Sequence, residues 1–291
     1  MEKVICIYHG NCTDGTTAAA VLLTKFPDCI LFPFEHGYKP EDLQEVIDKI
    51  DKDTTVYIVD FSLKEEDLKT VLSIAKEVVI IDHHIGVKET LERLAKEYKN
   101  LKYVFDNHRS GASLTWIYFY GDKNIPDLIK YVEDKDIWTW KYGETTKYIN
   151  TYLILLTNQP DKIKELFNKD ISDIIEKGKL LAQYTDYLIN RFIEKAKETK
   201  LKIGEYLVRG FNTNLFQSEI GNILSTKFNE AVVLFNVSGD KVKFSFRSCE
   251  GQKPTALDLA LILGGGGHRH AAGAVVPLKE FCNMIVLEEE Q

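Results

Sequence analysis

The feature of this sequence that most constrains its fold is a series of short apolar segments separated by segments with a helical pattern. Several of the apolar segments end at an aspartate, as at Asp60, Asp82 and Asp106. The apolar segments are residues 4–8, 29–34, 55–59, 77–81 and 103–105. Near-continuous apolar runs are typical of parallel strands buried on both faces. Strands that alternate with helices therefore predict a parallel sheet covered by helices on both sides.

The intervening segments read as amphipathic or alanine-rich helices. They are residues 16–26, 40–50, a helix after Ser62, and 89–98. In the second of these, Leu43, Val46, Ile47 and Ile50 share one face, which is helical spacing. Ser62 with Glu65 three positions later has the spacing of a capping box, so Ser62 is predicted to cap the third helix.

The pattern changes along the second half of the chain. Residues 110–160 read as mostly helical, and residues 171–199 read as one long helix. From Leu201, short strands near 201–209, 231–237 and 242–247 surround a helix near 218–228. The predicted fold class is therefore α/β, with a parallel-sheet domain (1–165), a connecting helix (166–200) and a smaller α/β C-terminal domain (201–291).

Composition narrows the classes of protein. The chain has 291 residues and a formal net charge of −7, and a run of about 18 apolar residues that could span a membrane is absent from the sequence. The N-terminus enters a strand-like run without a signal-peptide pattern, and the five cysteines are scattered. We therefore expect a cytoplasmic protein without a disulfide framework. The acidic balance argues against binding of long duplex by counterion release.

Histidines and carboxylates gather where the predicted strands end. They are His9, Asp14, Asp60, Asp82, His83 and His84. Ligands of an open parallel sheet bind outside the carboxyl ends of its strands, so these groups should converge on one edge. Their carboxylates would repel one another unless cations neutralised them. Carboxylate-rich sites favour manganese over zinc, and two ions about 4 Å apart could activate a water for attack on a phosphoryl group.

Each of these residues also has a simpler interpretation. An aspartate after a strand is often only a helix cap, and a single histidine is often structural. The adjacent Asp82, His83 and His84 are harder to explain in that way, because burying them without partners costs free energy.

Together, the motifs resemble those of the DHH phosphoesterases. HGNCTDG (9–15) is similar to the first motif of that family, Asp60 to the second, and residues 82–84 to the tripeptide that names it. YVEDKDIW (131–138) is similar to its fourth, acidic motif. VKFSFRS (242–248) and GGGGHRHAAGA (264–274) resemble the phosphate-binding strand and the glycine-rich signature of the associated C-terminal substrate domain.

The resemblance implies a manganese-dependent hydrolase of phosphodiesters or phosphoanhydrides, with one or two Mn²⁺ ions and Mg²⁺ or Co²⁺ as alternatives. It implies that His9 and Asp60 hold a first metal. It implies a second metal held by residues Asp14, Asp60, His83 and Asp134. Asp134 is preferred to Asp136 because the bulky Trp138 follows it by four positions, as in the family motif.

The resemblance also assigns the other members of the tripeptide. His84 would lie near the substrate phosphate as a proton donor or electrostatic stabiliser. Asp82 would orient the two histidines.

The first motif departs from the family pattern H-x-D-x-D-G. This chain has an extra residue and lacks the first aspartate. Asn11 or Cys12 would have to replace that ligand, or the position stays unfilled. We expect Cys12 to be a packing residue rather than a ligand.

The C-terminal domain offers a local anion site. Backbone N–H groups of the glycine run, including Gly265, Gly266 and Gly267, can approach a phosphate closely. Arg247 and His268 would add charge-assisted donors, and His270 is either a second donor or a surface residue.

The predicted partner is a short single-stranded oligonucleotide, or another small phosphate-bearing substrate, held between the two domains. Residues 201–291 carry 9 basic and 10 acidic side chains, which gives no basic track for a long strand. Exopolyphosphatase and cyclic-dinucleotide phosphodiesterase activity remain alternatives, as does a degenerate nucleotide-binding protein without activity. The sequence leaves the polarity of attack and a homodimer open.

Overall fold

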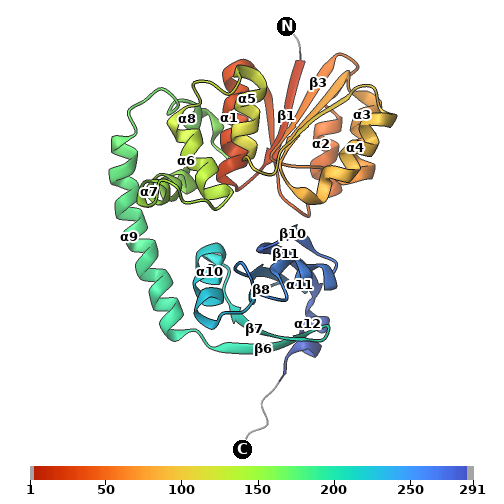
Figure 1. The fold of residues 1–291 in the computed structure, drawn as a ribbon. Helices are drawn as coiled ribbons and strands as arrows, with labels where there is room; N and C mark the ends of the chain where they lie inside the picture. The colour runs from red at the N-terminus through yellow and green to blue at the C-terminus, as the bar shows by residue number, and fades with distance from the viewer. Residues whose placement is uncertain (1–2, 287–291) are drawn as a thin grey trace, which may run out of the picture. The chain divides into compact units, whose positions relative to one another are not determined.

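The computed structural model describes residues 3–286, and the chain divides into two compact units, one up to Gln183 and one from Tyr184 onward (Figure 1). None of the described helices is long and apolar enough to cross a membrane. Each unit has its own sheet and its own core, which confirms the α/β fold class.

The first unit is built on five parallel strands in the order β2-β1-β3-β4-β5. These strands are β1 (Lys3–His9), β2 (Ile30–Phe34), β3 (Thr54–Val59), β4 (Glu77–Asp82) and β5 (Leu101–Phe105). All six residues of β3 are buried, because helices cover both faces of the sheet. The parallel sheet predicted from the apolar runs is therefore present.

Alternate residues of β1 feed two separate cores. Cys6 faces a cluster with α1 (Thr13–Lys25) and α5 (Gly111–Tyr120), whereas Ile5 and Ile7 face a cluster with three other helices. Those three are α2 (Pro40–Ile47), α3 (Glu65–Ile74) and α4 (Lys88–Glu97), and they lie on the opposite side of the sheet from α1 and α5 (Figure 1).

The start of α3 corrects one prediction. The helix begins at Glu65 with Lys64 as its N-cap, so Ser62 does not cap it. The Ser62 hydroxyl instead donates a hydrogen bond to Asp82 Oδ2 over 2.7 Å. A buried carboxylate on the neighbouring strand is a stronger acceptor than the helix start required.

Helices complete the first unit, as predicted for residues 110–160. They are η1 (Ile85–Val87), α6 (Asp127–Asp136), α7 (Glu144–Leu153), η2 (Ile154–Leu156), α8 (Pro160–Lys164) and the beginning of α9 (Ser172–Lys195). The long helix α9 ends at Lys195 rather than Thr199, because Glu198 already pairs into the second sheet.

The second unit has a six-stranded sheet in the order β10-β11-β9-β8-β7-β6, in which β7 and β8 are parallel and the other pairs are antiparallel. Its elements are β6 (Glu198–Ile203), β7 (Tyr206–Asn212), α10 (Gln217–Phe228), β8 (Val232–Ser238), β9 (Lys241–Arg247), α11 (Ala256–Ile262), β10 (Gly266–His268), β11 (Ala271–Pro277) and α12 (Leu278–Met284). The single strand predicted over residues 201–209 is instead a hairpin that turns at Gly204, where φ is +58°.

Candidate functional site

The candidate site lies at the carboxyl edge of the first sheet, at the switch point of its strand order. The chain runs from β1 to β2 on one side and then returns past β1 to β3 on the other. His9 ends β1, Asp60 follows β3, and Asp82 ends β4. Open parallel sheets place their ligands at such a point, because the loops diverge there.

Asp60 is the carboxylate at the centre of this edge. Its Oδ1 lies 3.1 Å from His83 Nε2, and its Oδ2 lies 3.4 Å from His9 Nδ1. Burial raises the pKa of Asp60, but the hydrogen bonds from the two imidazoles outweigh burial and hold the pKa well below its usual range. Asp60 therefore stays ionised between two histidines.

Asp82 organises the histidine pair. It accepts hydrogen bonds from the backbone N–H of His83 at 2.7 Å and of His84 at 3.2 Å, and its Oδ1 lies 2.6 Å from His84 Nδ1. Burial lowers the pKa of His84, but the bond to Asp82 outweighs it, so the pKa is raised. The arrangement favours an imidazolium at His84.

Asp14 is held by the N-terminus of α5. Its two oxygens accept hydrogen bonds from the backbone N–H of Gly111 at 2.6 Å and of Ala112 at 3.0 Å. A Cβ at Gly111 would lie 2.5 Å from Asp60 Cβ and 2.9 Å from Asp14 Oδ2. A residue without a side chain is therefore needed at this helix start, a requirement that sequence reasoning missed.

The structure brings Asp136, rather than Asp134, to the cluster. Asp136 Oδ2 lies 3.5 Å from His83 Nε2, and Asp14, His83 and Asp136 have ligand atoms within 4.8 Å of one another. The preference for Asp134 is therefore corrected. Spacing to Trp138 misled the prediction, because Asp134 and Asp136 lie in the last turns of α6 and face in different directions.

Asp134 has a structural role. Its carboxylate accepts hydrogen bonds from the hydroxyls of Thr139 and Thr146 and from the backbone N–H of Lys141 (2.7 Å) and Tyr142 (3.1 Å). These four donors fasten the segment after α6 to α7, and they occupy both oxygens.

The donor set fits divalent cations. Three carboxylates, Asp14, Asp60 and Asp136, lie close together without a lysine or arginine among the described contacts of the cluster. Burial and the charges of its acidic neighbours raise the pKa of Asp14 well above its usual value. Burial also raises the pKa of Asp136, to about 6, against the opposing charge of His83. Cations would relieve this repulsion, as they do in first-row metal sites built from carboxylate and imidazole ligands.

Asn11 and Cys12 take different positions. Asn11 has a left-handed φ of +53°, and its side chain hydrogen-bonds to Glu35 and Asn158. Cys12 Sγ lies 3.6 Å from Asp60 Oδ2, and His9, Cys12 and Asp60 have ligand atoms within 4.8 Å of one another. The structure therefore brings Cys12, and not Asn11, to the cluster, against the expectation of a packing residue.

His36 is a further neighbour that sequence reasoning missed. Its ring centroid lies 5.1 Å from that of His9 and 6.4 Å from that of His84. The signal was available, since His36 follows the end of β2 and the carboxyl ends of all these strands meet at one edge.

Arg247 ends β9 in the second unit. Its guanidinium donates to Ser245 Oγ, Ser218 Oγ and the Phe246 carbonyl over 2.8–2.9 Å. A Cβ at Gly221 would lie 2.5 Å from Arg247 Cγ, so this glycine lets α10 pack on the arginine stem. Burial lowers the pKa of Arg247, which is the expected effect on a cation with few acidic neighbours.

The glycine run is partly strand rather than loop. Residues 266–268 form β10, the edge strand of the sheet, and Gly265 and Gly267 are pressed against β11, where a Cβ would lie 2.1 Å and 2.7 Å from the carbonyls of Gly273 and Ala271. His268 ends β10. His270 Nδ1 lies 3.2 Å from Ser248 Oγ and its Nε2 lies 3.0 Å from Glu250.

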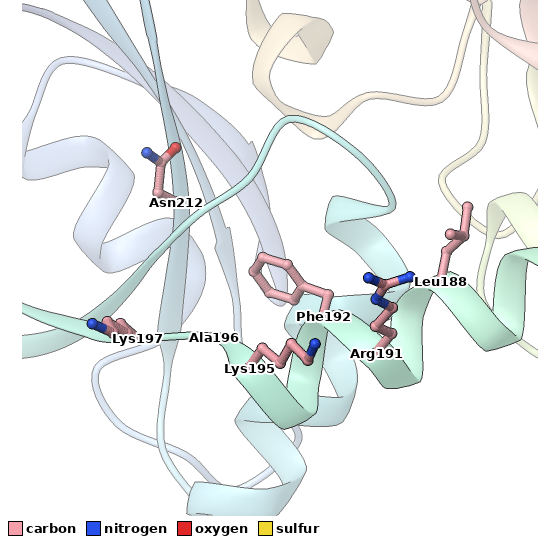
Figure 2. Close-up of a pocket in the computed structure, with 7 residues that line it drawn as sticks. All are labelled: Leu188, Arg191, Phe192, Lys195, Ala196, Lys197 and Asn212. Carbon is pink, nitrogen blue, oxygen red and sulfur yellow. The ribbon is translucent and has the colours of Figure 1, made fainter.

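A hollow of about 500 Å³ lies in the second unit beside the end of α9 (Figure 2). Its lining includes Phe192 and the cations Arg191, Lys195 and Lys197. The described lining offers neither a carboxylate nor an imidazole, so it lacks the groups for metal binding or proton transfer.

Fold and site together define an α/β protein with a metal-type cluster at a sheet switch point and a second unit bearing a partly buried arginine. The DHHA1 domain family model matches residues 203–287. An uncharacterized protein of Acanthamoeba polyphaga mimivirus is 28% identical over 288 residues, which is 92% of this chain and 66% of that relative, so the chain spans just under two thirds of its length.

Comparison with solved structures gives the same fold. RecJ from Thermus thermophilus in complex with Mn²⁺ has a TM-score of 0.54 at 16% identity over 97% of this chain and 51% of that chain. A pGpG-specific phosphodiesterase from Vibrio, PggH, has a TM-score of 0.48 at 14% identity over 97% of this chain and 96% of that one. The resemblance to the DHH phosphoesterases with a DHHA1 domain is confirmed.

Proposed function

We propose that the protein is a metal-dependent phosphoesterase that hydrolyses short oligonucleotides. The observation that carries this proposal is the cluster of carboxylates and histidines around Asp60 at the sheet switch point. The DHHA1 match and the fold shared with RecJ support the same class of enzyme.

In this proposal the metals are held by His9, Asp14, Asp60, His83 and Asp136, with Asp60 facing both groups of ligands. Manganese is the expected ion, with magnesium or cobalt as alternatives, because carboxylate oxygens dominate the set. Such ions, when bound, polarise a phosphoryl oxygen and lower the pKa of water.

The protein's own acid is His84. The Asp82 carboxylate fixes the proton of His84 on Nδ1, so that Nε2 is the nitrogen that can meet the substrate. The raised pKa of His84 keeps this nitrogen protonated, and it can donate to the leaving oxygen.

The second unit is proposed to bind the substrate phosphate. Arg247 is preoriented by two serine hydroxyls, and the N–H groups of β10 lie at a sheet edge with His268 at its end. These are donors for one or two phosphates rather than a long strand, which favours substrates of two to a few nucleotides.

Labelled dinucleotides and long single strands, each with and without Mn²⁺, test the proposal. We expect Mn²⁺-dependent release of mononucleotides, faster from the dinucleotide, and its loss in Asp82→Ala and His83→Ala. His108→Asn, a substitution of an exposed histidine on another loop, should keep the rate. Equal or better rates on long strands would contradict the substrate length. Hydrolysis of polyphosphate or cyclic dinucleotides alone would replace the substrate, and wild-type protein inert on every phosphoester would leave only binding.

A further inference from the structure

The loop between β1 and α1 places a sulfur atom beside Asp60. Cys12 is the N-cap residue of α1, with extended backbone angles (φ −116°, ψ 136°), but its side chain makes no hydrogen bond to the helix. Its Sγ lies 3.6 Å from Asp60 Oδ2 instead. Cysteine is not among the residues favoured at this position, so the capping requirement does not explain it.

The extra residue of the loop is taken up by Asn11. Its left-handed backbone bulges the chain, and its amide is bound to Glu35 and Asn158, away from Asp60. The bulge leaves Cys12 two residues before Asp14, with its side chain in the cluster.

The cluster around Asp60 contains two chemically different groups. On the Oδ2 side stand His9 Nδ1 at 3.4 Å and Cys12 Sγ at 3.6 Å. On the Oδ1 side stands His83 Nε2 at 3.1 Å, which is grouped with Asp14 and Asp136. One group is imidazole, thiol and carboxylate, whereas the other is imidazole and carboxylates only.

We propose that Cys12 is a thiolate ligand of the first metal and makes that position selective for a borderline-soft ion such as Zn²⁺, while the Asp14, His83 and Asp136 position prefers Mn²⁺. This inference rests on the proposed metal centre. Thiolate ligands select zinc-like ions, and carboxylate oxygens suit manganese. The centre is therefore heterobinuclear, with Asp60 shared between two unlike ions.

Binding balances in protons. The Cys12 thiol loses its proton to solvent as the sulfur–metal bond forms, so one proton is released for each ion taken up at this position, without any change of oxidation state. Burial and the charges of Asp60, Asp136 and Asp14 raise the pKa of the metal-free thiol, which keeps it protonated until a cation arrives.

Cobalt titration of the full chain tests the proposal, because a cobalt–thiolate bond gives a charge-transfer band in the near ultraviolet whether or not the protein is active. We expect the band in wild type to saturate at one equivalent. It should disappear in Cys12→Ser and Cys12→Asp and persist in Cys282→Ser, which changes an exposed cysteine of α12. Cys12→Asp places a favoured N-cap residue at the start of α1, so this variant is expected to fold, as circular dichroism checks.

Metal content gives a second readout. After dialysis against equal zinc and manganese, wild type should hold one of each, and Cys12→Asp should shift the zinc-to-manganese ratio toward manganese by at least about tenfold. Cobalt binding without the band, or an unchanged ratio in Cys12→Asp, would overturn the inference. A Cys12-dependent band without hydrolysis of any phosphoester would overturn the proposed function and leave the inference standing.

Discussion

At the scale of single residues, the site depends on which oxygen of which carboxylate faces inward. Asp134 and Asp136 differ by two positions on α6, yet one is bound by four protein donors and the other lies beside His83. Their spacing along the chain does not distinguish a ligand from a structural anchor, because both are acidic residues at a helix end.

Substitution of the two aspartates should separate these roles. Asp136→Asn should weaken Mn²⁺ binding by roughly 10–100-fold and leave the fold intact. Asp134→Asn should reduce the free energy of unfolding by roughly 2–3 kcal/mol, because an amide nitrogen cannot accept the hydrogen bonds that the carboxylate accepts. Calorimetric titration and denaturant unfolding measure the two effects; a destabilised Asp136→Asn with normal metal affinity would contradict the assignment.

His83 should make the metal-free protein sensitive to alkaline pH. Burial lowers the pKa of His83, but the hydrogen bond to Asp60 and the charge of Asp136 outweigh it and raise the pKa from 6.5 to about 10. The ion pair therefore stabilises the fold fully below pH 6.5, and this contribution is lost as the pH rises toward about 10.

Thermal unfolding in chelator should show this loss between neutral and alkaline pH. His83→Asn should flatten the dependence, and His108→Asn should keep it. Saturating metal should remove it, because ligation requires neutral imidazole. A wild-type protein whose metal-free stability rises over this range would refute the pairing.

At the scale of elements, close backbone approaches build the site. The N-terminus of α5 reaches Asp14 only because Gly111 has no side chain, and α1 starts against β1 only because Gly15 has none, since a Cβ there would lie 2.3 Å from the His9 carbonyl. Strand ends supply the ligands, and helix starts hold them.

Gly111→Ala should therefore push α5 from the sheet. We expect metal affinity to fall at least about tenfold, together with a lower melting temperature. Gly86→Ala is the matched control, because a Cβ at Gly86 meets nothing within 4 Å. Equal metal affinity in Gly111→Ala and wild type, measured by titration, would show that the contact with Asp14 is dispensable.

Arg247 acts through β9 and α10. Arg247→Met should raise the KM for a dinucleotide by roughly tenfold or more, because a charge-assisted pair with phosphate is lost, while metal affinity stays the same. Lys243→Met, at an exposed position on the same strand, should leave KM unchanged. An unaltered KM in Arg247→Met would remove this arginine from the substrate site.

At the scale of the whole molecule, the chain has separate cores in its two units. Each unit is expected to respond on its own to what it binds, so unfolding of the chain is not a single two-state event.

Mn²⁺ at about 100 times its dissociation constant should therefore stabilise the first unit by about 2.7 kcal/mol and leave the second unit nearly unchanged. Hydrogen exchange, read peptide by peptide, measures this directly. The gain in protection should fall on residues up to Gln183. Equal protection of the β9 and β11 peptides would show that the units are coupled.

The sequence by itself determined the periodic part of the protein. Buried parallel strands must be apolar along their length, and the residues that follow them must be at one edge, so the sheet and the group of His9, Asp60 and residues 82–84 could be predicted. The same logic would have found His36 after β2.

Only the tertiary structure decided what depends on side-chain direction and on contacts between distant segments. It selected Asp136 over Asp134, turned Ser62 toward Asp82, brought Gly111 against Asp14 across 97 residues, and placed Cys12 rather than Asn11 beside Asp60. Local spacing fixes which residues share an element, but the rotation of a helix end and the path of a bulged loop are set by packing against the other elements, which no short motif contains.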